Sequence, residues 1–309
     1  MSTRTTYETG LEKFNRTSTV VNIFFNLIFI ILALLCVIPV IVVLSISFSS
    51  EDSIRETGYH LLPVALSSEA YAYVVKQGTM ILRALGVSAL VTVVGTVLGV
   101  LLTTSMGYVL SRPTYKLNGF LTWVVFIPMI FNGGLVSSYF INTNLLGLKD
   151  SVWALILPLA VSSFNVIICK TFFKSTIPDG LIESAEIDGA SQLRIFFSII
   201  LPISLPVIAT IGLFLCFSYW NDWFQSMLYI DNQNLYSLQA LLNSLMSNVD
   251  ALAKNAASMG VSYAVLVATM PKESARMAVA IIIVLPVAFA YPFFQKYFIS
   301  GLTIGAVKG

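Results

Sequence analysis

The stretch IPDGLIESAEIDGASQLRIFFSIILPISLP, residues 177–206, is the most polar segment between two long apolar runs. Pro178 favours the first position of a helix, and Asp179 favours the positive end of the helix dipole. At about 100° per residue, acidic and apolar side chains fall on roughly opposite faces, with Asp179, Glu183 and Glu186 against Leu181, Ile182 and Ala185. Gly189 is typical of a helix end. The stretch predicts a short amphipathic helix, a glycine turn and a second helix that enters the next apolar run.

The polar face of this predicted helix is acidic. Helices that lie in a membrane surface usually carry Lys and Arg on their polar face. An acidic face is repelled by anionic lipid headgroups. We therefore interpret the helix as a docking element for a basic protein partner rather than as a lipid-binding helix.

The composition of the whole chain indicates a polytopic membrane protein. Its 309 residues are 57% hydrophobic and only 10% charged, whereas soluble domains carry about a quarter charged residues. A net charge of +2 without a basic patch gives no indication of a nucleic-acid partner. Cys36, Cys169 and Cys216 all lie inside apolar runs and are expected to be small buried hydrophobic residues, not disulfide or zinc ligands.

Six apolar runs each approach or exceed the roughly 20 residues that a bilayer helix needs. They lie at about 21–48, 82–111, 119–141, 153–173, 199–220 and 277–298. Because backbone polar groups must be satisfied inside lipid, these runs are expected to be helices. The predicted fold class is therefore all-α, with six transmembrane helices.

The distribution of Lys and Arg over the short connections predicts the orientation in the membrane. It places both termini and the loop 174–198 in the cytoplasm, and the long loop 225–276 outside. The expected organisation is a cytoplasmic N-terminal tail (1–20), a permease domain (21–298) and a cytoplasmic C-terminal tail (299–309). Leucine spacing from Leu238 to Leu245 predicts that part of the external loop is helical.

Glycine and proline residues predict close packing and breaks within the spans. The second run carries four glycines that permit close helix approach: Gly86, Gly95, Gly99 and Gly107. Runs three to five carry breakers near mid-membrane: Pro128 with Gly133 and Gly134, then Pro158, then Pro202 and Pro206. Such breaks line a cavity in many transporters and are equally common as packing kinks. No charged residue lies clearly at mid-depth in any run, which argues against a proton- or sodium-coupled pump.

The fifth run ends in a cluster of aromatic and polar residues, Tyr219, Trp220, Asn221 and Asp222, followed by Trp223. One interpretation is an aromatic belt at the outer membrane surface. The other is a substrate contact, because aromatic rings stack on apolar sugar faces while Asn and Asp bond hydroxyl groups. The residues themselves leave a gate structure and a substrate contact equally open.

The central stretch also resembles a known motif. Glu183, Ser184 and Ala185, followed by Gly189 and then by Leu201 with Pro202, resemble the EAA loop of permease subunits in binding-protein-dependent ABC importers. Ser184 stands where that family usually has alanine, a change between small residues. The resemblance implies that this loop docks into a cleft of the ATP-hydrolysing subunit. The docking residues would be Glu183, Ser184, Ala185, Asp188, Gly189, Leu201 and Pro202.

Two further segments resemble the carbohydrate branch of this family. The WNDW sequence at the end of the fifth run recurs among carbohydrate permeases. The C-terminal sequence GLTIGAVKG resembles the tail of the second permease in the maltose system, whose end inserts between the two ATPase subunits. The implied ATPase contacts are Gly301, Gly305, Lys308 and Gly309. In related permeases the loop corresponding to 225–276 reaches toward the external binding protein.

Together the resemblance implies a permease subunit of an ABC importer for a carbohydrate, in particular an oligosaccharide of the aldouronate type, in a bacterial cell membrane. The implied partners are a homologous second permease, two ATP-binding subunits, an extracellular or periplasmic solute-binding protein and membrane lipid. The sequence has no GxxxxGK[ST] phosphate loop, so ATP would be bound by the partner subunits; no cofactor, metal site or enzymatic activity is expected. The alternatives are an ABC importer for another solute, a stand-alone secondary transporter and a membrane-embedded enzyme.

Overall fold

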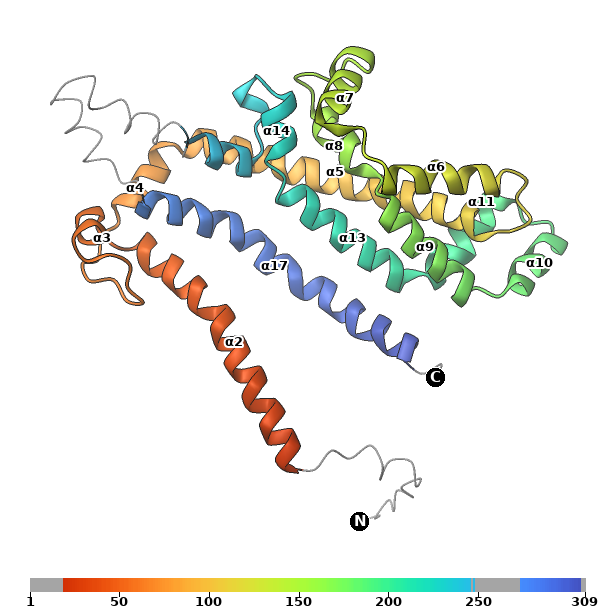
Figure 1. The fold of residues 1–309 in the computed structure, drawn as a ribbon, viewed down its shortest axis with the longest axis horizontal. Coiled ribbons are helices and arrows are strands. Elements are labelled where there is room, and N and C mark those ends of the chain that lie inside the picture. Colours follow the sequence, from red (N-terminus) through yellow and green to blue (C-terminus); the bar gives the residue numbers. More distant parts are fainter. Residues whose placement is uncertain (1–18, 246, 248–272, 307–309) are drawn as a thin grey trace.

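The computed structural model describes residues 19–245, 247 and 273–306. Helices make up most of this part of the chain, and it contains no strand beyond an isolated bridge between Ser49 and Leu66. The all-α prediction is therefore confirmed for the described residues. Figure 1 shows an elongated bundle whose long helices run roughly along one axis.

The centre of the bundle is α5 (Gly78–Ser111), which packs against α8 (Val152–Ala160), α9 (Ser163–Thr176) and α13 (Leu205–Trp220). The predicted close approach occurs at three glycines of α5. A Cβ atom would lie 2.5 Å from the Tyr219 ring at Gly95, 2.7 Å from the Ala160 carbonyl oxygen at Gly99 and 2.5 Å from the Cys169 Cβ at Gly107. Gly86 faces open space. Hence α5 is buried by neighbours on the side that carries its small residues.

The predicted breaks are present in the third, fourth and fifth runs. The third run consists of α6 (Asn118–Ile130), α7 (Gly134–Phe140) and a π-helical turn (Ile141–Leu145). The fourth bends by 47° between α8 and α9. The fifth run, from α11 (Gln192–Ile195) through a π-helical turn (Phe196–Ile200) and α12 (Leu201–Ile203), bends by 85° before α13. Pro128 and Pro158 lie inside helices, and the chain leaves the helix only two or three residues later.

Two helices are long and apolar enough to cross a membrane, α2 (Thr19–Ser47) and α5, or up to four spans if each bent pair forms one span. This number of candidate spans covers only the residues that the structure describes, so the six transmembrane helices remain a prediction. The breaks explain part of the difference, because the separate pieces of the third, fourth and fifth runs are too short to qualify alone.

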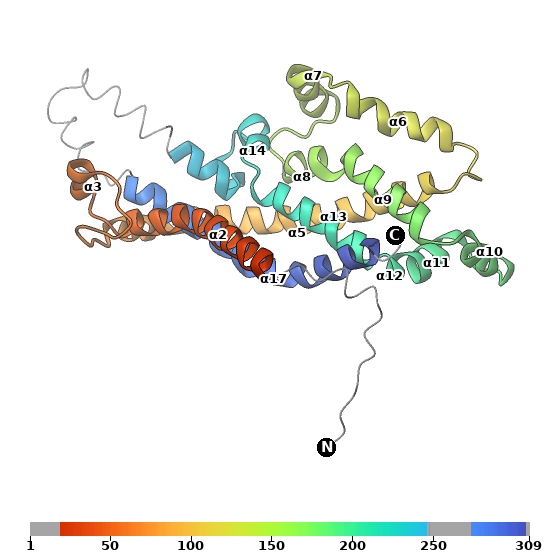
Figure 2. The ribbon, with the colours of Figure 1, turned by 60° about the horizontal axis from the view of Figure 1, so that its bottom comes forward.

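Two long helices form an outer layer. α17 (Glu273–Ala306) packs against α13 on one side and α2 on the other, as Figures 1 and 2 both show. None of the most apolar part of α2 is buried in the isolated chain. The expectation that all three cysteines are buried is wrong for Cys36, which lies exposed on α2, while Cys169 is buried and Cys216 half-buried. The reason is that α2 has a packing partner on one side only.

Part of the expected C-terminal tail, 299–309, is helical. Helix α17 continues past residue 298 to Ala306, so Gly301 and Gly305 belong to a helix. Its backbone hydrogen bonds override the weak helix propensity of two isolated glycines. Lys308 and Gly309 lie outside the described residues, as do residues 1–18 of the expected N-terminal tail.

The two ends of the bundle are built from different short helices. In Figure 1, α10 (Asp179–Ile187) and α11 lie at one end, and α3 (Glu51–Thr57) and α4 (Glu69–Lys76) lie at the other. The predicted long loop begins with α14 (Phe224–Tyr229) and a 3₁₀ turn (Gln233–Leu235). A helix follows over 238–245, as the leucine spacing predicts, and residues 246 and 248–272 are outside the description.

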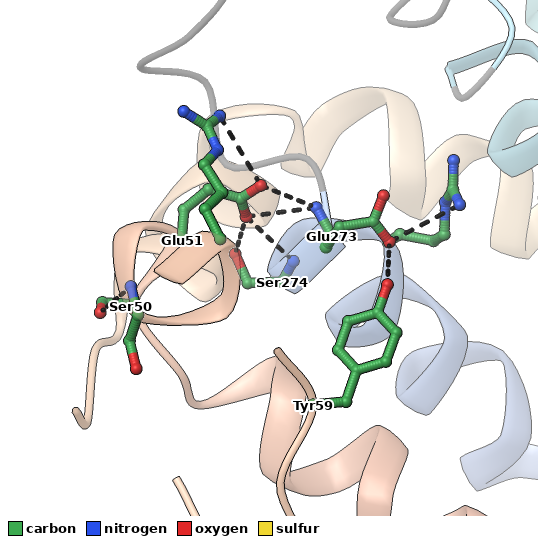
Figure 3. A network of polar contacts seen from close by, with 8 residues as sticks. Ser50, Glu51, Tyr59, Glu273 and Ser274 are labelled. Atoms are coloured by element: carbon green, nitrogen blue, oxygen red, sulfur yellow. Dashed lines mark hydrogen bonds and ion pairs between the residues drawn. The ribbon is translucent and has the colours of Figure 1, made fainter. Parts of the chain in front are cut away.

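A buried carboxylate joins α3 to the start of α17. Glu51 is only 7% exposed, and its side chain accepts hydrogen bonds from the backbone N–H groups of Glu273 and Ser274 at 3.2 Å each and from the Ser274 hydroxyl at 3.1 Å. Figure 3 shows these contacts converging on one carboxylate, with Tyr59 donating to Glu273 beside it. Because the first N–H groups of a helix lack intrahelical partners, Glu51 acts as an N-terminal cap from another element.

Candidate functional site

The predicted amphipathic helix exists as α10. It begins at Asp179, because Pro178 has an extended backbone (ψ 140°) and serves as the N-cap rather than as the first helical residue. It ends at Ile187, and the turn that follows contains Gly189, which has a φ of +79°. Only glycine adopts this conformation without strain, so the sequence correctly predicted the turn at this residue. After the turn, the Ser191 side chain caps α11 by accepting from the Arg194 N–H.

The two faces of α10 differ as predicted except at Leu181, which is exposed. Ile182 and Ala185 are buried against the core, whereas Glu183, Ser184 and Asp188 are exposed. Ala185, one of the predicted docking residues, therefore faces the bundle and positions the helix. Two further apolar side chains are also exposed, Ile187 at 86% and Leu193 at 72%. Their exposure at one end of the bundle adds an apolar component to the acidic face.

Leu201 and Pro202, also predicted to dock, lie in α12, where the chain returns to the bundle. Leu201 is half-buried and packs on the core, and Pro202 is exposed just before the 85° bend. Their position indicates a role in shaping the bend, and the docking role stays a prediction. The sequence motif alone does not distinguish these roles.

A single ion pair ties α10 to the central helix. The Arg112 guanidinium, at the C-terminal end of α5, donates to the Asp179 carboxylate at 2.7 Å. Arg112 also lies over the Tyr108 ring, 5.4 Å from its centroid, and that ring contacts Phe196 at a centroid distance of 5.5 Å. The end of α5 thus touches both halves of the loop. Arg112 was missed because its partner lies 67 residues away.

A cavity of about 450 Å³ opens beside this ion pair. Its lining combines Arg112, Glu186, Gln192 and Leu193 with three aromatic residues: Tyr108, Tyr115 and Phe196. The Glu186 carboxylate accepts from the Gln192 amide at 2.5 Å, and the Nε and Nη2 atoms of Arg112 are buried without a hydrogen-bond partner. The arrangement offers polar and apolar groups to a partner side chain. The described residues contain no cluster of His, Cys, Asp or Glu that could hold a metal ion.

The second predicted site, at the end of α13, is largely used for packing. Tyr219 is 1% exposed, and its hydroxyl donates to the Ile156 carbonyl at 2.7 Å. Trp220 is 7% exposed, and its indole N–H donates to the Ile283 carbonyl at 3.1 Å. In this conformation both side chains are packed inside the bundle, and their expected role as a gate or a substrate contact stays a prediction. The close approach of α5 at Gly95 is what encloses the Tyr219 ring.

Asn221 and Asp222 differ from these two aromatic residues. Asn221 is exposed, and its side-chain amide donates to the Phe217 carbonyl at 3.0 Å. Asp222 is half-buried and accepts from the Gln225 N–H at 3.2 Å. Burial raises the pKa of the Asp222 carboxyl to about 6, while backbone hydrogen bonds from Gln225 and Phe224 lower it. The Asp222 carboxylate therefore caps the start of α14 by accepting a backbone hydrogen bond. Of the four predicted residues, only Asn221 presents an exposed side chain.

No protein-family model matches the sequence. The polygalacturonan/rhamnogalacturonan transport system permease protein YtcP of Bacillus subtilis is 39% identical over 277 residues, which cover 90% of this chain and 94% of the relative. Protein LplC of the same organism is 38% identical over 273 residues, 88% of this chain and 90% of the relative. The arabinooligosaccharides transport system permease protein AraQ of B. subtilis is 27% identical over 287 residues, 92% of this chain and 95% of the relative.

A solved structure shares the fold. The crystal structure of a bacterial ABC transporter involved in the import of the acidic polysaccharide alginate contains a chain that matches with a TM-score of 0.75 and 27% identity, covering 92% of this chain and 99% of that chain. Sequence and fold agree over nearly the whole length. The chain belongs to the permease subunits of ABC sugar-transport systems.

Proposed function

We propose that this chain is a transmembrane permease subunit of an importer that carries an oligosaccharide into the cell, driven by ATP hydrolysis in partner subunits. The observation that carries the function is α10: a short helix at one end of the bundle with an exposed acidic face, exposed Ile187 and a direct bond from Asp179 to α5. A helix exposed in this way can bind a partner and transmit the partner's movement to the bundle core.

The proposed assembly contains a homologous second permease, two ATP-binding subunits and an external solute-binding protein. The apolar surface of α2 supports contact with lipid and with the second permease. The end with α3 and α4 would face the outside and the binding protein, and the end with α10 would face the cytoplasm together with both termini. Six spans follow if each broken run crosses the membrane once.

The proposed mechanism is alternating access. Closure of the ATPase dimer around ATP would draw the α10 helices of the two permeases together. The Arg112–Asp179 bond and the contact of Tyr108 with Phe196 would transmit this movement to α5. The bends of 47° and 85° in the fourth and fifth runs are the places where such a bundle changes shape most readily.

An oligosaccharide is the proposed cargo because the relatives are named for such substrates. Their names refer to polygalacturonan or rhamnogalacturonan and to arabinooligosaccharides, and the matching structure belongs to an alginate importer. These are plant or algal cell-wall polymers or fragments of them. One of them, alginate, is an acidic polysaccharide.

The decisive experiment is purification of the complex from its native membrane after mild solubilisation, followed by reconstitution into liposomes. An ATP-binding subunit and a second permease should co-purify. Uptake of trigalacturonate or of arabinotriose should require both ATP and the solute-binding protein. A chain that purifies alone and moves sugar without ATP would overturn the function and favour a secondary transporter.

A further inference from the structure

The cavity beside the Arg112–Asp179 ion pair lies where two apolar runs end. Arg112 directly follows α5, and the apolar helix α6 begins at Asn118. Arg112 and Tyr115, both from this short connection, line the cavity, and Tyr115 is 43% exposed. A connection between two spans lies where the membrane meets water, and Tyr is enriched at that level. The cavity is therefore placed at the headgroups of the proposed cytoplasmic leaflet, provided that the second and third runs cross the membrane as proposed.

Three buried donor atoms at this cavity have no hydrogen-bond partner among the described residues. They are Nε and Nη2 of Arg112 and the hydroxyl of Tyr108, a residue that is only 6% exposed. Both residues line the cavity, whereas Asp179 bonds only the third nitrogen, Nη1. Buried donors almost always have partners, because an unsatisfied one costs free energy. The three unpaired donors therefore indicate a ligand that supplies oxygen atoms.

The two unpaired nitrogens of Arg112 share one edge of the guanidinium plane. The parallel N–H bonds of such an edge match two oxygen atoms of one carboxylate or phosphate. The guanidinium lies over the Tyr108 ring, 5.4 Å from its centroid, so the Tyr108 hydroxyl is a third donor in the same region. The donor set is therefore suited to an oxyanion.

Glu186 argues against a simple anion as the ligand. Its side chain lines the same cavity, and its carboxylate accepts from the Gln192 amide. Because Asp179 already balances the charge of Arg112, a simple anion would meet the uncompensated charge of Glu186. A ligand that also carries a cation avoids this repulsion by pairing the cation with Glu186. The charges thus favour a zwitterion with an oxyanion and a cation.

The rest of the wall is apolar and partly open to the surface. It includes Val109, Ile182, Leu193 and Phe196, of which Leu193 is 72% exposed. The volume of about 450 Å³ lies within the range of about 300–1,000 Å³ that is usual for small-molecule sites. A headgroup fits such a space, while the acyl chains of a lipid would stay in the bilayer. Pockets between transmembrane helices on the cytoplasmic side bind lipid headgroups in this way.

We propose that this cavity binds the headgroup of a zwitterionic phospholipid, with its phosphate at Arg112 and Tyr108 and its ammonium group at Glu186. The three donor atoms are enclosed in this conformation, so binding requires the Arg112 side chain to turn toward the open cavity. A carboxylate side chain of a partner protein would bond the same donors but would supply no cation for Glu186. The bound lipid would join the end of α5 to α10 and α11.

The test measures lipid binding to the purified complex by native mass spectrometry, a measurement that requires no transport. The probes are palmitoyl-oleoyl phosphatidylethanolamine, the anionic phosphatidylglycerol with the same chains, and glycerophosphoethanolamine, which is the headgroup without chains. Tyr108→Phe removes the hydroxyl and keeps the ring, and Arg112→Gln removes the guanidinium. Glu186→Gln removes the charge and keeps an acceptor for Gln192. Thr103→Val is the matched control, because the Thr103 hydroxyl is also buried and unpaired on α5 but does not line the cavity.

The wild type should bind phosphatidylethanolamine more tightly than phosphatidylglycerol. Tyr108→Phe should weaken this binding about 3- to 10-fold, the loss expected for one hydrogen bond, and Thr103→Val should not change it. Arg112→Gln should weaken it by about 10-fold or more, because a bidentate bond between charged groups is lost. Glu186→Gln should abolish the preference between the two lipids. Since the Tyr108 hydroxyl has no partner among the described residues, Tyr108→Phe is expected to fold, and it decides the test even where Arg112→Gln fails to assemble.

Equal binding of phosphatidylethanolamine by the wild type and Tyr108→Phe would overturn the site, as would a preference of the wild type for phosphatidylglycerol. Displacement of the lipid by an equimolar amount of glycerophosphoethanolamine would also overturn it, by assigning the cavity to a soluble phosphate ester. Loss of the ATP-binding subunit from Tyr108→Phe, with lipid binding unchanged, would assign the donors to a partner protein instead. Failure of the complex to import sugar leaves these measurements intact and would count against the proposed function alone.

Discussion

The two ends of the bundle are held together in contrasting ways. At the α3 end, the Glu51 carboxylate is 7% exposed and accepts from two N–H groups and a hydroxyl of the α17 start. At the α10 end, one ion pair of 2.7 Å joins Arg112 to an Asp179 side chain that is 72% exposed. The first joint is a buried network, and the second is a bond at the surface.

The difference indicates how each end is used. A buried, satisfied carboxylate is costly to break, because separation would leave several polar groups without partners. The Arg112 guanidinium is mostly buried, but the Asp179 carboxylate is exposed, so solvent screens the ion pair and it breaks more easily than the buried network. We interpret the α3 end as a rigid joint between α3 and α17. We interpret the α10 end as a movable element whose exposed Ile187 and Leu193 are available for contact with a partner protein.

The largest expected effect is on the movable end. Glu183→Lys should abolish sugar transport while the protein still inserts into the membrane, because it reverses a charge on the exposed face of α10. Uptake by cells that express the variant measures this, with membrane content determined by immunoblot. Glu56→Lys, an exposed charge reversal on α3, is the control and should transport normally. Normal uptake by Glu183→Lys would refute the docking role.

The rigid end should give the largest loss of stability. Glu51→Ala removes an acceptor of three hydrogen bonds and leaves the Ser274 N–H unsatisfied, at a cost of about 2–3 kcal/mol. The thermal midpoint of the purified protein in detergent measures the change. The neighbouring Asp52 is exposed, so Asp52→Ala should have little effect. Equal loss in both variants would show that α3 is sensitive as a whole and not through this carboxylate.

Asp222, just before α14, gives the stability of the protein a dependence on pH. Burial raises the pKa of its carboxyl from 3.8 to about 6 in the folded protein, so the folded state binds the proton more strongly than the unfolded state. The resulting stability is fully present below the unfolded pKa and is lost as the pH rises through about 6. After allowance for partial solvent exposure, the carboxyl should make the protein about 1 kcal/mol less stable at pH 7.5 than at pH 5. Asp222→Asn should abolish this difference in thermal midpoints, and a difference that persists would assign it to another group.

The smallest effect is expected from the surface ion pair itself. Asp179→Asn should change the free energy of unfolding by only about 0.5 kcal/mol, because the carboxylate is exposed. Transport should nevertheless fall about 2- to 5-fold if the pair passes movement from α10 to α5. Asp231→Asn is the control: it breaks a second 2.7 Å ion pair, with Lys149, outside the loop. A parallel fall in both variants would show that any surface ion pair has this effect.

Much of the movable end is predictable from residues 177–206, because helix capping and amphipathic periodicity depend on neighbours in the chain. The turn at Gly189 and the buried positions of Ile182 and Ala185 follow from such local rules. The buried position of Tyr219 does not follow from such local rules. Its sequence context, next to Trp220 and Asn221, is that of a surface belt or a sugar contact, yet the approach of α5 at Gly95 encloses its ring.

The sequence by itself determined the class of the protein: a helical membrane chain with breaks in three runs and an acidic amphipathic helix after the fourth run. These features depend on composition and on residues a few positions apart. Only the tertiary structure decided which distant groups meet: Arg112 with Asp179, Glu51 with Ser274, and Tyr219 with Ile156. The physical reason is that hydrogen bonds and close packing between elements depend on how whole helices approach, and small residues such as Gly95, Gly99 and Gly107 set that approach.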